Sequence, residues 1–164
     1  MDAEGYWGAP ADVVAEVGRI TISGTALEAA LYRLAGAVGA GDLTNRPASV
    51  AASKLAEKAQ ELVAQPGLEK RPKLADFLAH LERFPAVATS ALEARGRVVH
   101  SMYVSYREGE GGEWELGHHR TRETRIEAIR PIVIAEFEAA RREVEDAASE
   151  GWMLFGTLFK GELD

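Results

Sequence analysis

The chain has no cysteine among its 164 residues. This absence excludes disulfide bonds, thiolate catalysis and cysteine-based zinc sites. The first ten residues have neither the basic start nor the apolar run of a signal peptide. No stretch approaches the roughly 20 consecutive apolar residues that a membrane-spanning helix needs. We therefore expect a protein without membrane contact and, by elimination, a cytoplasmic location.

Positive charge is also scarce, because 19 Lys and Arg stand against 26 Asp and Glu and leave a net charge of −7. Such a balance disfavours broad, non-specific binding to nucleic acid. Residues 95–130 differ, since they hold seven Arg, six Glu and three of the four His. Two interpretations are open: a local cationic site on an acidic body, or the more common solvated face of mixed charge.

Apolar residues make up 46% of the chain and charged residues 27%, as in ordinary globular proteins. The length suits one domain with a full core, so we expect residues 1–164 to form a single domain. Residues 1–11 are rich in Gly, Ala and Pro and are expected to be a flexible arm.

Apolar residues recur at three- and four-residue steps and predict four main helices, with a kink at a central proline and a stop at a late glycine. The expected helices span residues 12–38, 47–64, 71–102 (kink or restart at Pro85) and 122–149 (stop at Gly151). Residues 102–119 are β-prone around a glycine-rich turn and predict a hairpin insertion. Because short connections favour antiparallel neighbours, the fold class predicted is all-α: an antiparallel bundle of four main helices with a small β-hairpin before the last long helix.

The tail, residues 151–164, is unusually apolar for a chain end. It includes Trp152, Phe155 and Phe159. Such a segment either packs on the core or contacts a partner.

One charged residue falls on an apolar helical stripe. Arg95 is three residues after Leu92 and four before Val99, so it is in line with core positions. A guanidinium remains charged and needs a partner when it is buried. Glu28 has a similar position in the first helix, and we expect the two side chains to meet across the helices.

His100 follows Arg95 by five residues and shares a stripe with Glu93 and Arg97, which are in position to orient and charge its imidazole. A histidine moves protons near neutral pH, and an arginine holds a phosphate through paired hydrogen bonds. Together they suit attack of an RNA 2′-hydroxyl on the adjacent phosphate without a metal. The alternative is structural: Arg95 as an ion-pair partner and His100 as a half-buried helix residue.

The segment ALEARGRVVHSMY, with its Arg-x4-His spacing, resembles the motif of HEPN-like all-α proteins. The early helix ALEAALYRLAG, the β-prone segment and the closing helix resemble their layout. The resemblance implies a helical homodimer in which two Arg–His motifs form one metal-independent ribonuclease site of toxin or defence type. Arg95 would then bind the scissile phosphate and His100 would act as acid or base. A cognate antitoxin or regulatory protein would be a further partner.

Two positions depart from the family pattern. Gly96 follows the arginine where many active members have a polar residue, often Asn. Tyr103 comes three residues after the histidine, where some members have a Tyr two residues after it. Some HEPN-like proteins are not nucleases, so a non-catalytic interaction or regulatory module stays open beside the ribonuclease.

A second basic group follows the β-prone segment. His119, Arg120 and Arg122 could extend a track for RNA phosphates, whereas a solvated hairpin exit is the simpler interpretation. No carboxylate stands at a convincing ligand spacing from the histidines, so we expect neither a metal nor a cofactor.

Overall fold

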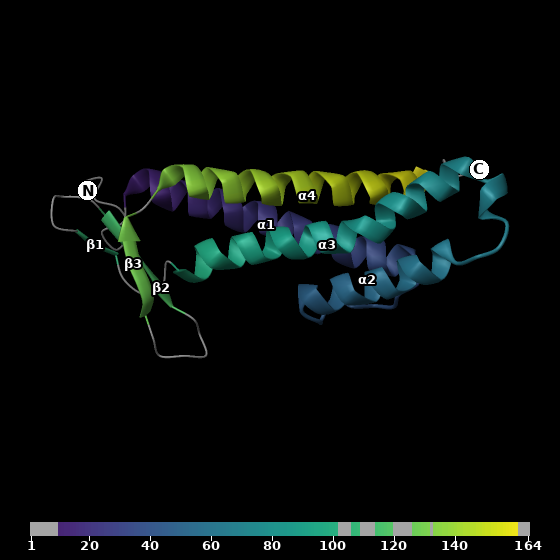
Figure 1. The fold of residues 1–164 in the computed structure, drawn as a ribbon, viewed down its shortest axis with the longest axis horizontal. Coiled ribbons are helices and arrows are strands. Elements are labelled where there is room, and N and C mark those ends of the chain that lie inside the picture. The colour runs from purple at the N-terminus through teal and green to yellow at the C-terminus, as the bar shows by residue number, and fades with distance from the viewer. Residues whose placement is uncertain (1–9, 102–105, 109–113, 120–125, 132, 161–164) are drawn as a thin grey trace.

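The computed structural model describes residues 10–101, 106–108, 114–119, 126–131 and 133–160, and only the backbone from residue 101 to residue 131. Its helices are α1 Ala11–Ala37, α2 Ala48–Val63, η2 Leu68–Lys70 (a 3-10 turn), α3 Pro72–Ser101 and α4 Ile134–Lys160. Its strands are β1 Tyr106–Glu108, β2 Trp114–His119 and β3 Ile126–Pro131. Figure 1 shows the helices lying lengthwise together, with the sheet at one end. The expected helical bundle is confirmed.

Two clusters of apolar side chains hold the helices together. The larger cluster draws on all four helices and includes Leu31, Leu55, Leu81, Phe84 and Val144. The smaller cluster contains Val13, Ile20, Ala94, Phe137 and Ala140. Because α2 contributes nothing to the smaller cluster, the bundle has four helices at one end and three at the sheet end (Figure 1).

The helix directions differ from those of the expected antiparallel bundle, because only α3 runs against the other helices. α3 runs against α4, since Ser90 bonds to Glu143 while Phe84 packs against Gly151 further along α4. α1 and α4 instead run in the same direction, as Figure 1 shows. α2 also runs in the direction of α1 (Figure 1), because residues 38–47 return along α1 before α2 begins, where Tyr32 bonds to the carbonyl of Arg46. The rule that short connections give antiparallel neighbours covers neither this ten-residue connection nor α1 and α4, which do not follow each other in the chain.

The third expected helix continues through its proline. α3 begins at Pro72, which suits a first helical position because it needs no backbone donor there. Pro85 lies inside α3 and is buried, and the hydroxyl of Thr89 donates to its carbonyl oxygen at 2.8 Å. The helix does not restart at Pro85.

The expected last helix, residues 122–149, is wrong at both ends. α4 begins only at Ile134, and β3 occupies part of the predicted helix. Pro131 explains this start, because the residue before a proline is pushed toward extended backbone. α4 also continues through Gly151 to Lys160, so residues 151–160 of the apolar tail form the last third of a helix.

The hairpin expected at residues 102–119 is part of a larger sheet. β1 pairs with β2 and β2 pairs with β3, all antiparallel, in the order β1-β2-β3. Glu115 faces Pro131 and His118 faces Ala128 in the second pairing, with an irregularity between His118 and His119. β2 contacts α3, so the sheet lies against the end of the bundle at which α3 finishes.

Candidate functional site

Arg95 and Glu28 meet across α1 and α3, as expected. Arg95 Nη1 donates to Glu28 Oε1 at 2.7 Å. The side chains keep 26% and 30% of their surface exposed, so water screens the pair in part. The guanidinium expected to bind a phosphate is therefore directed at α1 and balanced by a carboxylate.

A glycine makes room for this arginine. A Cβ at Gly24 would lie 2.6 Å from Arg95 Nε, closer than real side chains approach. Gly24 lies one helical turn before Glu28, so the arginine crosses α1 over the glycine to reach the acid. Arg95 Nε is buried without a hydrogen-bond partner among the described residues. The close fit at Gly24 gives Arg95 its direction.

His100 lies in the last turn of α3 and is exposed. Glu93 and Arg97 are exposed as well. Within the described part of the chain no hydrogen bond or ion pair joins His100 to Arg95, and Gly96 contributes no side chain between them. The structure thus brings Arg95 to Glu28 and leaves His100 on the surface at the sheet end.

The remaining predicted site residues are not placed by the structure. Tyr103, Arg120 and Arg122 lie outside the described residues, and for His119 only the backbone in β2 is described. Their roles toward RNA stay predictions.

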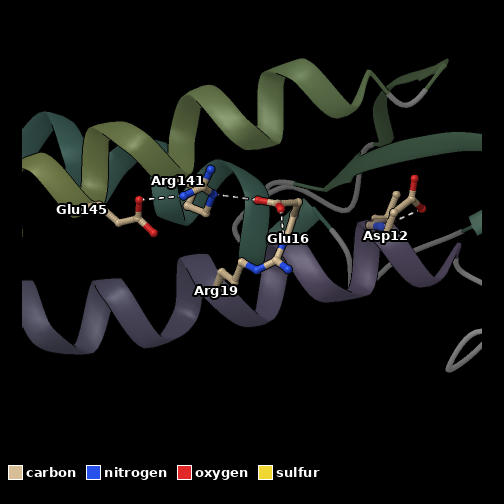
Figure 2. A network of polar contacts seen from close by, with 6 residues as sticks. Asp12, Glu16, Arg19, Arg141 and Glu145 are labelled. Atoms are coloured by element: carbon tan, nitrogen blue, oxygen red, sulfur yellow. Dashed lines mark hydrogen bonds and ion pairs between the residues drawn. The ribbon is translucent and has the colours of Figure 1, made fainter.

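The sequence analysis missed a charged network between α1 and α4, drawn in Figure 2. Glu16 is only 7% exposed, and its Oε2 accepts a hydrogen bond from Arg141 Nε at 3.0 Å. Its other oxygen pairs with Arg19, while Arg141 Nη1 donates to Glu145 Oε2 at 2.7 Å. Glu16 lies between Val13 and Ile20 on the apolar stripe of α1. It therefore carries the same signal as Arg95, a charged residue in line with core positions.

The network balances its own charges. The hydrogen bond to Glu145 is the main cause that raises the pKa of Arg141 above its usual value, and the charges of Glu145 and Glu16 add to it. A nearly buried carboxylate between two guanidiniums joins α1 to α4 at one register. It is a structural contact, not a site open to a substrate.

An apolar surface covers the far end of α4. From Gly151 to Phe159 no residue is charged. Trp152, Phe155 and Phe159, here called the aromatic strip, pack one against the next along the helix. The ring centroids are 5.8 Å apart in the edge-to-face pair Trp152–Phe155 and 6.2 Å apart in the tilted pair Phe155–Phe159. Trp152 exposes 41% of its surface, Phe159 84% and the neighbouring Met153 67%.

A groove of about 870 Å³ borders the strip. We call it the glycine groove; its lining includes Ala29, Tyr32, Gly36, Gly39, Gly41 and Phe155. Gly39 and Gly41 have positive φ angles of 82° and 100°, which glycine adopts without strain. Tyr32 donates to the carbonyl oxygen of Arg46 at 2.7 Å, and burial, with the nearby charge of Glu28, raises its pKa. The groove is thus built from small residues beside aromatic rings.

Comparisons with known proteins identify no relative: no family model, no curated protein and no solved structure matches the chain. Among the described residues, no group of His, Asp and Glu is arranged to hold a metal ion. No helix in the described ranges combines the length and the apolar character needed to cross a membrane.

Proposed function

We propose that this protein is a non-catalytic helical interaction module, and that it binds a protein partner through the C-terminal third of α4. The observation that carries the proposal is the exposed aromatic strip. Monomeric proteins rarely expose contiguous apolar patches larger than a few hundred Å², and patches at or above that size often mark interaction sites. Aromatic side chains are also the usual anchors of protein interfaces.

The helix that carries the strip supports this interpretation. Gly151 and Leu154 on its inner side are buried in the bundle, while Trp152, Met153 and Phe159 face outward. A helix that is apolar on both sides is normally covered on both sides. Within the described bundle only the inner side of this segment is covered.

Photo-crosslinking in the cells that make the protein tests the proposal. Benzoylphenylalanine replaces Phe159 or, as a matched control, Ile22, which is 73% exposed on α1. We expect one defined protein to be crosslinked from position 159 and not from position 22. Identical products from both positions, or none from position 159, would contradict an interface there.

A second candidate function is a metal-independent endoribonuclease of toxin or defence type that acts as a homodimer. What favours it is the exposure of His100, together with an Arg95 that is partly exposed and bound through only one nitrogen among the described residues. His100 would take the proton of an RNA 2′-hydroxyl while Arg95 holds the phosphate that the 2′ oxygen attacks. The bond from phosphorus to the 5′ oxygen then breaks, a 2′,3′-cyclic phosphate forms, and the leaving 5′ oxygen takes a proton from water. Glu28 would compete with that phosphate, so the ion pair must open before RNA binds.

RNA cleavage in EDTA tests this second candidate. We expect an active protein to leave 2′,3′-cyclic phosphate ends, and His100→Ala and Arg95→Ala each to lower the rate by at least about a hundredfold. His80→Ala and Arg83→Ala are matched controls, because both residues are exposed on α3 away from the motif. Cleavage that survives in His100→Ala, or no cleavage of varied RNAs by the folded protein, would remove the nuclease interpretation.

A further inference from the structure

We infer that the partner of the aromatic strip is a second copy of this chain, and that Phe159 of each copy inserts into the glycine groove of the other. This inference rests on the interaction proposed above and names its occupant. It starts from one surface on which a protruding ring and an unfilled groove lie next to each other.

The two features are physically continuous. Phe155 lines the groove and also packs against Trp152 on one side and Phe159 on the other. Phe159 is 84% exposed and is the most prominent ring of the strip. When a projection and a recess of one chain are neighbours, a twofold axis between them lets two copies fill each other's recess.

The groove suits an aromatic ring. A Cβ at Gly36, Gly39 or Gly41 would meet nothing within 4 Å, so the space above these glycines is open. Tyr32 and the copy's own Phe155 supply aromatic walls. Aromatic pairs stack best with ring centroids about 4.5–7 Å apart, which an inserted phenyl ring reaches between such walls.

Charge also favours a second copy at this place. Two chains of net charge −7 repel each other over most of their surface, but the segment from Gly151 to Phe159 has no charge. Arg33 and Asp42 both line the groove, so it presents one charge of each sign. A partner's Phe159 in the groove would bring the last carbonyls of its α4, which carry partial negative charge, toward Arg33 and the adjacent Lys160 toward Asp42.

The exposed area predicts a weak dimer. Trp152, Met153 and Phe159 together expose on the order of 400 Å² per copy, taking about 150–250 Å² for a large side chain. A standard interface uses about 800 Å² per partner, and the lining of the glycine groove supplies only part of the difference. We therefore expect a transient dimer with a Kd of about 1–100 µM.

Sedimentation velocity of the purified chain over about 1–200 µM tests the inference. We expect dimers, and we expect Phe159→Asp and Gly36→Phe each to raise the dissociation constant at least about tenfold, since one removes the ring and the other fills the groove. Ile22→Asp changes an exposed apolar residue elsewhere on α1 and should leave the constant unchanged. Circular dichroism confirms that each variant is folded.

Disulfide trapping locates the contact, because the chain has no cysteine of its own. Phe159→Cys mixed with Gly36→Cys should form a mixed disulfide, whereas Phe159→Cys mixed with Ile22→Cys should not. In this mixed dimer the copy with Gly36→Cys still has Phe159, which inserts into the unchanged groove of the copy with Phe159→Cys.

A monomer at every concentration, or a dimer that neither Phe159→Asp nor Gly36→Phe weakens, overturns the inference. A monomer that is still crosslinked to another protein from position 159 would overturn this inference alone and leave the proposed interaction surface standing.

Discussion

At the scale of single residues, this protein places charged side chains on apolar helical faces and balances each one. Arg95 reaches Glu28, and Glu16 lies between Arg19 and Arg141. A lone charge on such a face would lose hydration without compensation, so its partner follows from its position. The sequence was sufficient to predict the first pair. It contained the same signal for Glu16, which was overlooked.

Replacing Gly24 by alanine tests the close fit around Arg95. The added Cβ would overlap the arginine side chain, push it off α1 and break its bond to Glu28. We expect a loss of about 1–3 kcal/mol in the free energy of unfolding, measured by urea denaturation. Gly18→Ala is the control, because its Cβ meets nothing within 4 Å and alanine favours a helix by up to about 1 kcal/mol. Equal stabilisation of both variants would show that Arg95 is not held by Gly24.

Replacing Glu16 by glutamine tests the network between α1 and α4. The amide keeps an acceptor but removes the charge that faces two guanidiniums. We expect the free energy of unfolding to fall by about 1–3 kcal/mol, as for a hydrogen bond to a charged group. Glu61→Gln breaks the exposed pair with Lys58 and should change stability by less than about 1 kcal/mol. The measurement is urea denaturation at neutral pH, and a matching small effect for Glu16→Gln would contradict its structural role.

At the scale of elements, the length of α4 depends on the helices that pack against it. Gly151 looks like a helix stop in the sequence, yet it lies inside α4 and faces α1 and α3. A Cβ there would be 2.7 Å from Phe84 Cζ and 2.9 Å from Ala30 Cβ. The glycine is needed for close packing of three helices, which no local pattern reveals.

Gly151→Ala is therefore expected to lower stability although alanine favours helices. Overpacking against Phe84 and Ala30 should cost about 1–3 kcal/mol in the free energy of unfolding. Gly156→Ala lies in the same helix with open space at its Cβ and should gain up to about 1 kcal/mol. Thermal unfolding followed by circular dichroism compares the two, and a higher melting temperature for Gly151→Ala would refute the close contact.

At the scale of the whole molecule, the same helices run through both clusters of apolar side chains. α1, α3 and α4 contribute to each cluster, and α2 covers only the larger one. The strip and His100 lie at opposite ends of this bundle, since α3 ends where α4 begins (Figure 1). At 1.5 Å per helical residue they are roughly 35 Å apart. A dimer formed through the strip would therefore not by itself join two Arg95–His100 motifs, and the two candidate functions make separate demands on the molecule.

Because the same helices cross both clusters, we expect a single cooperative unfolding transition. Leu55→Ala in the larger cluster and Ile20→Ala in the smaller one should each lower the free energy of unfolding by about 2–5 kcal/mol. Each variant should move the circular dichroism and tryptophan fluorescence curves together. Curves that separate in Ile20→Ala would show that the sheet end unfolds independently.

The sequence by itself determined the helical class, the approximate ranges of α1, α2 and α3, and the meeting of Glu28 with Arg95. These depend on local periodicity and on the cost of burying an unpaired charge, and both can be recognised along the chain. The tertiary structure alone decided the start of α4 after β3, its passage through Gly151, its parallel run beside α1, and the exposure of the aromatic strip. Each of these depends on which helical face meets which, and that choice is made only when the elements pack together.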